Sequence, residues 1–520
     1  MKKKISDFVK KIRENDNFLF LLFFVIIVLT RIPGIIILES DNEPGFDGAY
    51  YYNSAKNINE GNGEVTTIKD KWYNNWEDNR GEIETPYYLA PLYVYLLALL
   101  FKISSSLLAI RIFNTALMAC SIIVYYLLIK KLFNRDIAIF SSFLLIINPL
   151  YYLYSISLLR ESLYILIYLT SIYFITSPIN NHKSKNLIFS GFFAGLSFLA
   201  RLPGLFLVLS IFIWLFFYKR KYKESLTFVL ICVVTIIPWL LNNYINHGFI
   251  FPYFSIYSDI YPANLEVSYH LRTMTFFAIW IRIESFFVDI SSISGLFILM
   301  PFILLGMFRN RTNGAVVLFI IFISITLMYH VGHHYVFRYL LPIIPLCLPL
   351  GIKECLFYLE KLKKENYLDF KLNPKEMFSI FLILIFLANM FFIPINLIDH
   401  YVSRYYDNNQ SKYEWIEDTS YYKIASTSPQ QTNYFTERDT VILDNKHNEI
   451  TLELFIDEYD FDLLVFDDHK YGLYQSNDFL IQFFDAQDNQ TFIIGKYELS
   501  LLEIKEGEKN AIKFFGVSKT

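Results

Sequence analysis

Long runs of apolar residues separated by short polar connections make up most of the chain before residue 398. A run of about 20 apolar residues forms a helix long enough to cross the roughly 30 Å hydrocarbon core of a membrane. The pattern predicts spans near 18–38, 107–129, 136–153, 162–178, 187–200, 203–218, 226–244, 290–308, 314–330, 339–357 and 377–397. We therefore predict an all-α polytopic membrane protein with about 11–13 transmembrane helices.

Two long polar segments interrupt this pattern. Residues 39–106 form a large first loop, and residues 398–520 form a tail. Within the tail, residues 424–427, 440–443 and 462–466 are strand-like, and residues 492–504 alternate as in a hairpin. The predicted organisation is a basic N-terminus (1–17), a transmembrane domain (18–397) that includes the first loop, and a small C-terminal α/β domain (398–520).

Composition supports this division. Of 520 residues, 54% are hydrophobic and only 18% are charged, which excludes an ordinary soluble protein. The tail from residue 399 onward has 23 acidic and 11 basic residues, a net charge of −12, so the rest of the chain is cationic at +9. All four cysteines fall in or beside apolar runs, and none lies in the tail. Their placement indicates no disulfide framework, zinc site or thiol nucleophile.

Lysine and arginine in short connections favour the cytoplasmic side of a membrane. The basic clusters predict a cytoplasmic N-terminus, an extracytoplasmic first loop and an extracytoplasmic C-terminal domain, in a plasma (inner) membrane. The first apolar run is long and lacks a small-residue cleavage site, so we expect a retained helix. The topology requires that Tyr87 to Ile103 does not cross, and that the apolar stretch 187–218 breaks at Arg201-Leu202-Pro203-Gly204.

The first loop contains a candidate catalytic carboxylate. Asp47, Tyr51 and Ala55 are four residues apart, so on a helix starting near Gly45 they share one face. Asp47 would lie in the first turn, where the helix dipole favours its charged form. A plain N-terminal cap is the alternative interpretation, and Asp41 and Glu43 are near enough in the sequence to compete for the role.

Other ionisable residues fall on the same predicted side. They are Arg160-Glu161 between two apolar runs, Arg201 at the helix break, and His333-His334 with Arg338-Tyr339. An ionisable residue at membrane depth indicates a functional site, and arginine suits bidentate binding of phosphate oxygens. A salt bridge between neighbours or an anchor at the membrane interface would also explain each residue. No metal-ligand spacing occurs, and the two adjacent histidines would diverge in regular structure.

A set of short motifs follows in a fixed order. It comprises Asp47-x3-Tyr51-x3-Ala55, Ala90-Pro91-Leu92-Tyr93, Arg111-Ile112-Phe113-Asn114, Leu159-Arg160-Glu161-Ser162-Leu163, Gly191-x3-Gly195-Leu196-x3-Ala200-Arg201-Leu202-Pro203, Ile237-Pro238-Trp239 and Arg338-Tyr339-Leu340-Leu341-Pro342. Together these motifs resemble the GT-C membrane glycosyltransferases. The branch is that of glycosyltransferase family 39, which includes protein O-mannosyltransferases and the aminoarabinose transferases of lipid A. The resemblance covers roughly residues 15–400.

The resemblance implies a polyprenyl-phosphate sugar donor, and transfer to a lipid, glycan or protein acceptor on the extracytoplasmic side with inversion at the anomeric carbon. It implies that Asp47 is the catalytic base and that Glu161 is a second acidic residue of the site. Tyr51, Arg201, His333, His334, Arg338 and Tyr339 are the candidate substrate contacts. No cofactor or nucleic-acid partner is expected, and a divalent cation stays an open alternative. A lipid-linked donor also explains why no nucleotide-binding glycine motif is needed.

Three other classes of protein remain as alternatives. A flippase or transporter of lipid-linked sugars would need ionisable residues near mid-membrane and often has repeated halves, whereas here the charges gather at one side. A non-catalytic surface or assembly protein would use the acidic tail for binding. A polysaccharide polymerase or ligase usually has its large outer loop late in the chain, whereas here it comes first.

Overall fold

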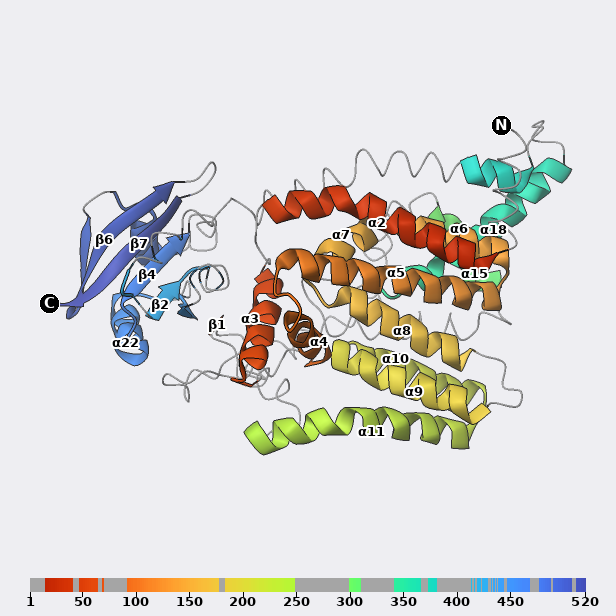
Figure 1. The fold of residues 1–520 in the computed structure, drawn as a ribbon, viewed down its shortest axis with the longest axis horizontal. Coiled ribbons are helices and arrows are strands. Elements are labelled where there is room, and N and C mark those ends of the chain that lie inside the picture. Colours follow the sequence, from red (N-terminus) through yellow and green to blue (C-terminus); the bar gives the residue numbers. More distant parts are fainter. Residues whose placement is uncertain are drawn as a thin grey trace.

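The computed structural model has a long helical bundle with a small sheet-containing domain at one end (Figure 1). It describes residues 15–40, 46–63, 68–69, 91–176, 183–247, 299–309, 341–365, 373–380, 413, 416, 419–421, 423–428, 432, 434, 436, 438–443, 447–467, 477–487, 490–506 and 511–520. This architecture confirms the predicted fold class, a helical polytopic membrane protein with a C-terminal α/β domain.

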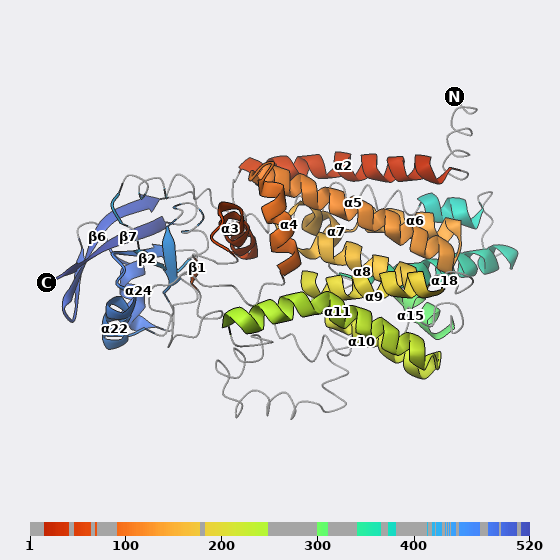
Figure 2. The same cartoon turned by 60° about the horizontal axis from the view of Figure 1, so that its bottom comes forward.

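The helices of the bundle and its end are α2 (Asp16–Ser40), α3 (Phe46–Glu60), α4 (Pro91–Phe101), α5 (Leu107–Leu132), α6 (Arg135–Ile146), α7 (Pro149–Ile156), α8 (Glu161–Ile175), α9 (Lys183–Ala200), α10 (Gly204–Ile213), the π-helical turn η1 (Trp214–Tyr218), α11 (Tyr222–His247), α15 (Met300–Arg309) and α18 (Ile344–Lys364). Helices α2, α5, α8, α9 and α11 lie side by side in sequence order (Figure 1). Helix α3 lies between the bundle and the sheet domain in both views (Figures 1 and 2).

Three helices in the described part are long and apolar enough to cross a membrane, over Asp16–Leu38, Leu107–Leu132 and Tyr222–Ile245. Large apolar side chains on two of them point outward, as Leu29 is 61% exposed and Leu230 is 62% exposed. Such outward-facing leucines suit contact with lipid tails rather than water. Helix α4 has only 11 residues, about 17 Å at 1.5 Å per residue, which is shorter than the roughly 30 Å hydrocarbon core.

The predicted span at 136–153 is broken. Residues 136–153 do not form one straight helix, because α6 ends at Ile146 and α7 starts at Pro149, with a bend of 60° between them. Asn148 is extended (ψ 127°), and its side chain accepts hydrogen bonds from the backbone N–H groups of Leu150 and Tyr151. The ring of a proline disfavours the helical conformation in the residue before it, so Asn148 ends one helix and caps the next.

The predicted break at 201–204 is confirmed. Helix α9 ends at Ala200 and α10 begins at Gly204. A Cβ atom at Gly204 would clash with the backbone of Ser197 and Phe198. The close return of α10 onto α9 therefore requires glycine at this position.

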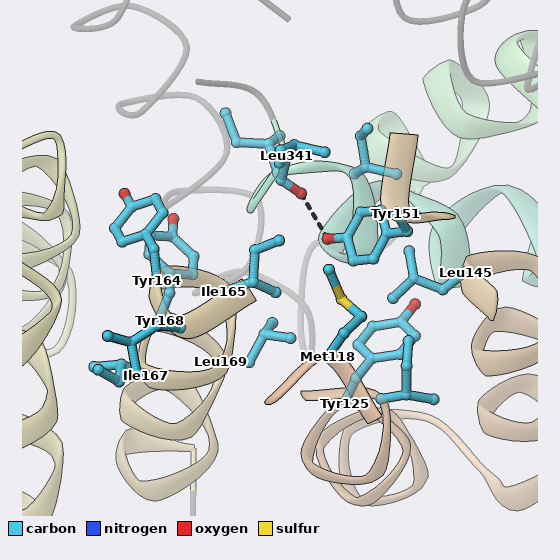
Figure 3. Packing of buried hydrophobic residues seen from close by; sticks show 14 of the residues in the cluster. Met118, Tyr125, Leu145, Tyr151, Tyr164, Ile165, Ile167, Tyr168, Leu169 and Leu341 are labelled. Atoms are coloured by element: carbon cyan, nitrogen blue, oxygen red, sulfur yellow. Dashed lines mark hydrogen bonds between the residues drawn. The ribbon is translucent and has the colours of Figure 1, made fainter. Parts of the chain in front are cut away.

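The core of the bundle joins segments that are far apart in sequence. Helix α5 packs against α2, α6, α7 and α8. The hydroxyl of Tyr151 on α7 donates to the backbone oxygen of Leu341, just before α18, at 2.7 Å (Figure 3). Tyr164 and Tyr168, on α8, pack edge to face in the same core, with ring centroids 5.7 Å apart. The early and late parts of the transmembrane domain thus share one core.

The sheet has the strand order β1-β3-β2-β4-β7-β6-β5. Its strands are β1 (Ile68–Lys69), β2 (Lys423–Ser426), β3 (Asp439–Ile442), β4 (Leu463–Asp467), β5 (Thr491–Ile494), β6 (Tyr497–Glu506) and β7 (Ala511–Lys519), with helices α22 (Glu449–Tyr459) and α24 (Asp478–Phe484). Strands β1 to β4 are parallel, and β5 to β7 are antiparallel additions. The three predicted strands and the hairpin are confirmed, whereas β7 was not predicted. Unexpectedly, β1 comes from the first loop.

Candidate functional site

Helix α3 brings Asp47 to the end of the bundle. Asp47 lies in the first turn, as predicted, and is half-buried. The next residue, Gly48, lies directly against Leu158, because an added Cβ would be 3.0 Å from Leu158 Cδ2 and 3.1 Å from its backbone oxygen. The start of α3 therefore lies against the turn that leads into α8. This contact places the first turn of α3, which carries Asp47, against the turn that leads to Arg160 and Glu161.

Tyr51, one turn after Asp47, links three elements. Its side chain is buried, and its ring meets Tyr93 of α4 edge to face with centroids 5.4 Å apart. The guanidinium carbon of Arg160 lies 5.5 Å from the centroid of the Tyr51 ring. A guanidinium over an aromatic face is attracted by the ring quadrupole. Tyr51 thus holds the cation of Arg160 on the side of α3 that carries Asp47.

Glu161 and Arg201, two of the predicted site residues, form a buried ion pair. Arg201 Nη1 lies 2.7 Å from Glu161 Oε1, and the side chains are 1% and 2% exposed. Glu161 is the first residue of α8, and Arg201 follows the last residue of α9. The helix break at 201–204 therefore brings Arg201 to the start of α8. In this arrangement its charge is matched by Glu161.

The second oxygen of Glu161 has an unusual environment. Oε2 is buried and has no hydrogen-bond partner within the part of the chain that the structure describes. The hydroxyl of Tyr164, one turn along α8, is likewise buried without a partner among the described residues. The ring of Tyr164 lies 6.0 Å from the guanidinium carbon of Arg201. Buried polar atoms are normally satisfied, so these two indicate a polar position beside the ion pair.

The turn before Glu161 is held in place by polar residues of α5. Asn114 Nδ2 donates to the backbone oxygen of Ser157 at 2.7 Å, and Arg111 donates to those of Ile156 and Leu38. Thr115 Oγ1 donates to the backbone oxygen of Ser155 at 3.1 Å. We did not predict these roles, although Arg111, Asn114 and Thr115 share one face of an apolar helix by their spacing. That spacing is the signal that would have found them.

The remaining predicted residues cannot be placed. His333, His334, Arg338 and Tyr339 lie outside the described residues. Within the described part, no group of three or more His, Cys, Asp or Glu side chains could hold a metal ion. Of the two predicted site carboxylates, Glu161 binds Arg201 through one of its oxygens. The described residues thus do not make up a metal site by themselves.

The start of α3 and the turn before α8 thus bring three kinds of group to the end of the bundle. They are the half-buried carboxylate of Asp47, the guanidinium of Arg160 over the Tyr51 ring, and the buried Glu161–Arg201 ion pair. A carboxylate near cations can accept a proton while the cations stabilise negative charge that develops elsewhere on a substrate. The arrangement therefore suits the transfer of a group away from an anionic leaving group.

Comparison with known proteins gives both a family match and a fold match. The family model for dolichyl-phosphate-mannose-protein mannosyltransferase matches residues 88–241. This region contains Asn114, Glu161 and Arg201, but not Asp47. A search of curated proteins finds no match.

Solved structures of membrane enzymes share the fold. ArnT from Cupriavidus metallidurans bound to undecaprenyl phosphate has a TM-score of 0.58 at 10% identity, covering 95% of this chain and 97% of that one. The Archaeoglobus fulgidus oligosaccharyltransferase in the apo form has a TM-score of 0.61 at 14% identity, covering 88% and 70%. The archaeal oligosaccharyltransferase AglB from Archaeoglobus fulgidus, with an inhibitory peptide and a dolichol-phosphate, has a TM-score of 0.58 at 12% identity, with the same coverage.

The chain therefore has the fold of the GT-C superfamily of membrane glycosyltransferases, and the resemblance noted in the sequence is confirmed at this level.

Proposed function

We propose that this protein is an integral membrane glycosyltransferase. It moves a sugar from a polyprenyl-phosphate donor to a lipid, glycan or protein acceptor on the extracytoplasmic face of the plasma membrane, with inversion. The GT-C fold and the mannosyltransferase family match support this proposal. Undecaprenyl phosphate in the ArnT structure and dolichol-phosphate in the AglB structure support a donor carried on a lipid phosphate.

The observation that carries the proposal is the contact of Gly48 with Leu158. It brings the start of α3 against the turn before Glu161, more than 100 residues later in the chain. As a result, Asp47, the cation of Arg160 and the Glu161–Arg201 pair gather at one end of the bundle. A glycosyl transfer from a phosphate needs both of the functions gathered here, a base for the acceptor and positive charge near the leaving group.

In the proposed reaction, Asp47 accepts the proton of the acceptor hydroxyl or amine, which requires a heavy-atom distance of about 3 Å. The acceptor atom attacks the anomeric carbon, and the bond from that carbon to the phosphate oxygen breaks. The bonding electron pair leaves with the polyprenyl phosphate. Attack from the face opposite the phosphate inverts the configuration. The carboxylate of Asp47 also stabilises positive character at the anomeric carbon.

Two cationic groups have separate roles in this proposal. Arg201 is paired with Glu161 and positions the start of α8, so it is a positioning residue. Arg160 lies over the ring of Tyr51, on the face of α3 that carries Asp47, and we assign it to the donor phosphate. Arg338, Tyr339 and the two histidines at 333 and 334 stay candidates for further donor contacts. A divalent cation is not required by this scheme.

The test is the Asp47→Asn variant in proteoliposomes supplied with undecaprenyl-phosphate-linked mannose or aminoarabinose. We expect sugar release from the donor that the wild type uses to fall to background, because the amide cannot take the acceptor proton. Binding of undecaprenyl phosphate should persist. The matched control is Glu60→Gln, at the exposed far end of the same helix, which should leave turnover unchanged. Near-normal turnover by Asp47→Asn would contradict the assignment of Asp47 as the catalytic base.

A further inference from the structure

Helix α3 is held from two sides. On the side of the bundle, Gly48 contacts Leu158 and the Tyr51 ring meets Tyr93. On the side of the sheet domain, the ring of Tyr52 meets the ring of Tyr434 edge to face, with centroids 5.3 Å apart. Both views show α3 between the two parts of the molecule (Figures 1 and 2). The helix that carries Asp47 is thus in contact with both parts.

Tyr434 belongs to the C-terminal segment by sequence, in the connection from β2 to β3. In the structure, however, it packs against the hydrophobic cluster of the transmembrane domain. The Tyr52 ring that it meets also packs on Phe101 of α4, with centroids 5.1 Å apart. Tyr434 is therefore the outermost ring of a short aromatic stack that runs from α4 through α3 to the C-terminal domain.

A second connection reinforces the first. Strand β1 follows the end of α3 after a few residues and forms the edge of the sheet, where it pairs in parallel with β3, with Ile68 opposite Thr440 and Lys69 opposite Val441. The first loop is thus joined to the C-terminal domain at both α3 and β1. Backbone pairing at a sheet edge fixes register without depending on particular side chains. Together the two connections place α3 and β1 against the C-terminal domain.

We propose that the C-terminal domain is a positioning element for the catalytic helix α3, and that Tyr434 is its positioning residue. This inference rests on the proposed role of Asp47. An isolated helix of about 15 residues is marginal in water, so contacts on its two faces must fix it. A displacement of about 1 Å at a reacting group can reduce turnover by about a hundredfold. The contact of Tyr434 with Tyr52 lies about one and a half turns along α3 from Asp47. A small rotation of α3 at this contact would therefore move the carboxylate of Asp47.

The test compares Tyr434→Ala with Tyr434→Phe in the full-length protein in lipid nanodiscs. Two quantities are measured: amide hydrogen exchange of residues 46–60, and turnover of the undecaprenyl-phosphate sugar that supports activity. Tyr434→Ala should speed exchange in α3 and lower kcat by about tenfold or more, with little change in KM for the donor. Tyr434→Phe keeps the ring and should match the wild type in both measurements.

Tyr459→Ala is the matched control, because Tyr459 packs on Phe455 in the separate hydrophobic cluster around α22. It should leave exchange in α3 unchanged. If Tyr434→Ala does not accumulate as folded protein, Tyr434→Leu takes its place and is judged by the same two measurements.

Unchanged exchange in α3 or unchanged kcat in the Tyr434 variant would overturn the inference. A fully active Asp47→Asn variant would overturn the proposed function instead. The two failures are distinguishable, because hydrogen exchange does not depend on turnover.

Discussion

Removing one member of the buried Glu161–Arg201 pair should destabilise the protein far more than removing both. The two side chains are 2% and 1% exposed, and their charged atoms are 2.7 Å apart. Arg201→Met leaves the carboxylate of Glu161 buried without a cation. Glu161→Leu leaves the guanidinium of Arg201 buried without an anion. The double variant leaves neither charge in the core.

The expected magnitudes follow from this burial. Loss of one partner of a buried pair costs about 3–5 kcal/mol of unfolding free energy, because the remaining charge stays desolvated. Replacement of both partners by apolar residues of similar volume is often nearly neutral. The double variant should therefore be more stable than either single variant. The coupling energy between the two sites should therefore approach the sum of the losses seen in the two single variants.

The measurement is a double-mutant cycle of unfolding free energies, obtained by SDS-driven unfolding in mixed micelles and followed by tryptophan fluorescence. Lys361→Ala supplies the control, since its partner Glu365 lies four residues away and both side chains are about half exposed. An exposed pair of this kind should contribute about 0.5 kcal/mol or less. If the losses of the two single variants simply add in the double variant, the pair is not coupled and the reasoning fails.

Two further predictions concern the donor and the C-terminal domain. Arg160→Ala should weaken binding of undecaprenyl phosphate, measured by native mass spectrometry, by about tenfold or more, because a hydrogen bond to a charged group contributes roughly 1.5–3 kcal/mol. The control Lys102→Ala changes an exposed residue at the end of α4 and should bind like the wild type. Binding by Arg160→Ala equal to that of the wild type would remove Arg160 from the site. Hydrogen bonds from Lys496 and Tyr497 hold the pKa of Asp457 below its usual value, so this stabilisation is present above about pH 4 and is lost as the pH falls through the lower pKa of the folded state. Asp457→Asn should therefore lower stability at pH 7, as measured by hydrogen exchange of β6, and the loss should shrink as the pH falls below about 4. A loss that does not depend on pH would contradict this.

The sequence alone determined the elements whose signals are local. Apolar runs predicted most of the described helices of the bundle, and proline with glycine predicted the break between α9 and α10. Alternation and β-branched residues predicted β2, β3, β4 and the β5–β6 hairpin. The bend between α6 and α7 also had a local signal in Asn148-Pro149, which the apolar pattern concealed.

Only the tertiary structure decided which of these elements meet. The pairing of Glu161 with Arg201, the contact of Gly48 with Leu158 and the addition of β1 to the C-terminal sheet each join residues far apart in the chain. The periodicity of a helix or strand indicates which of its faces is apolar, but not which other element of the chain packs against that face. Asp47 could therefore be singled out from the sequence as a candidate. Its neighbours were fixed by the packing of the first loop between the bundle and the C-terminal domain.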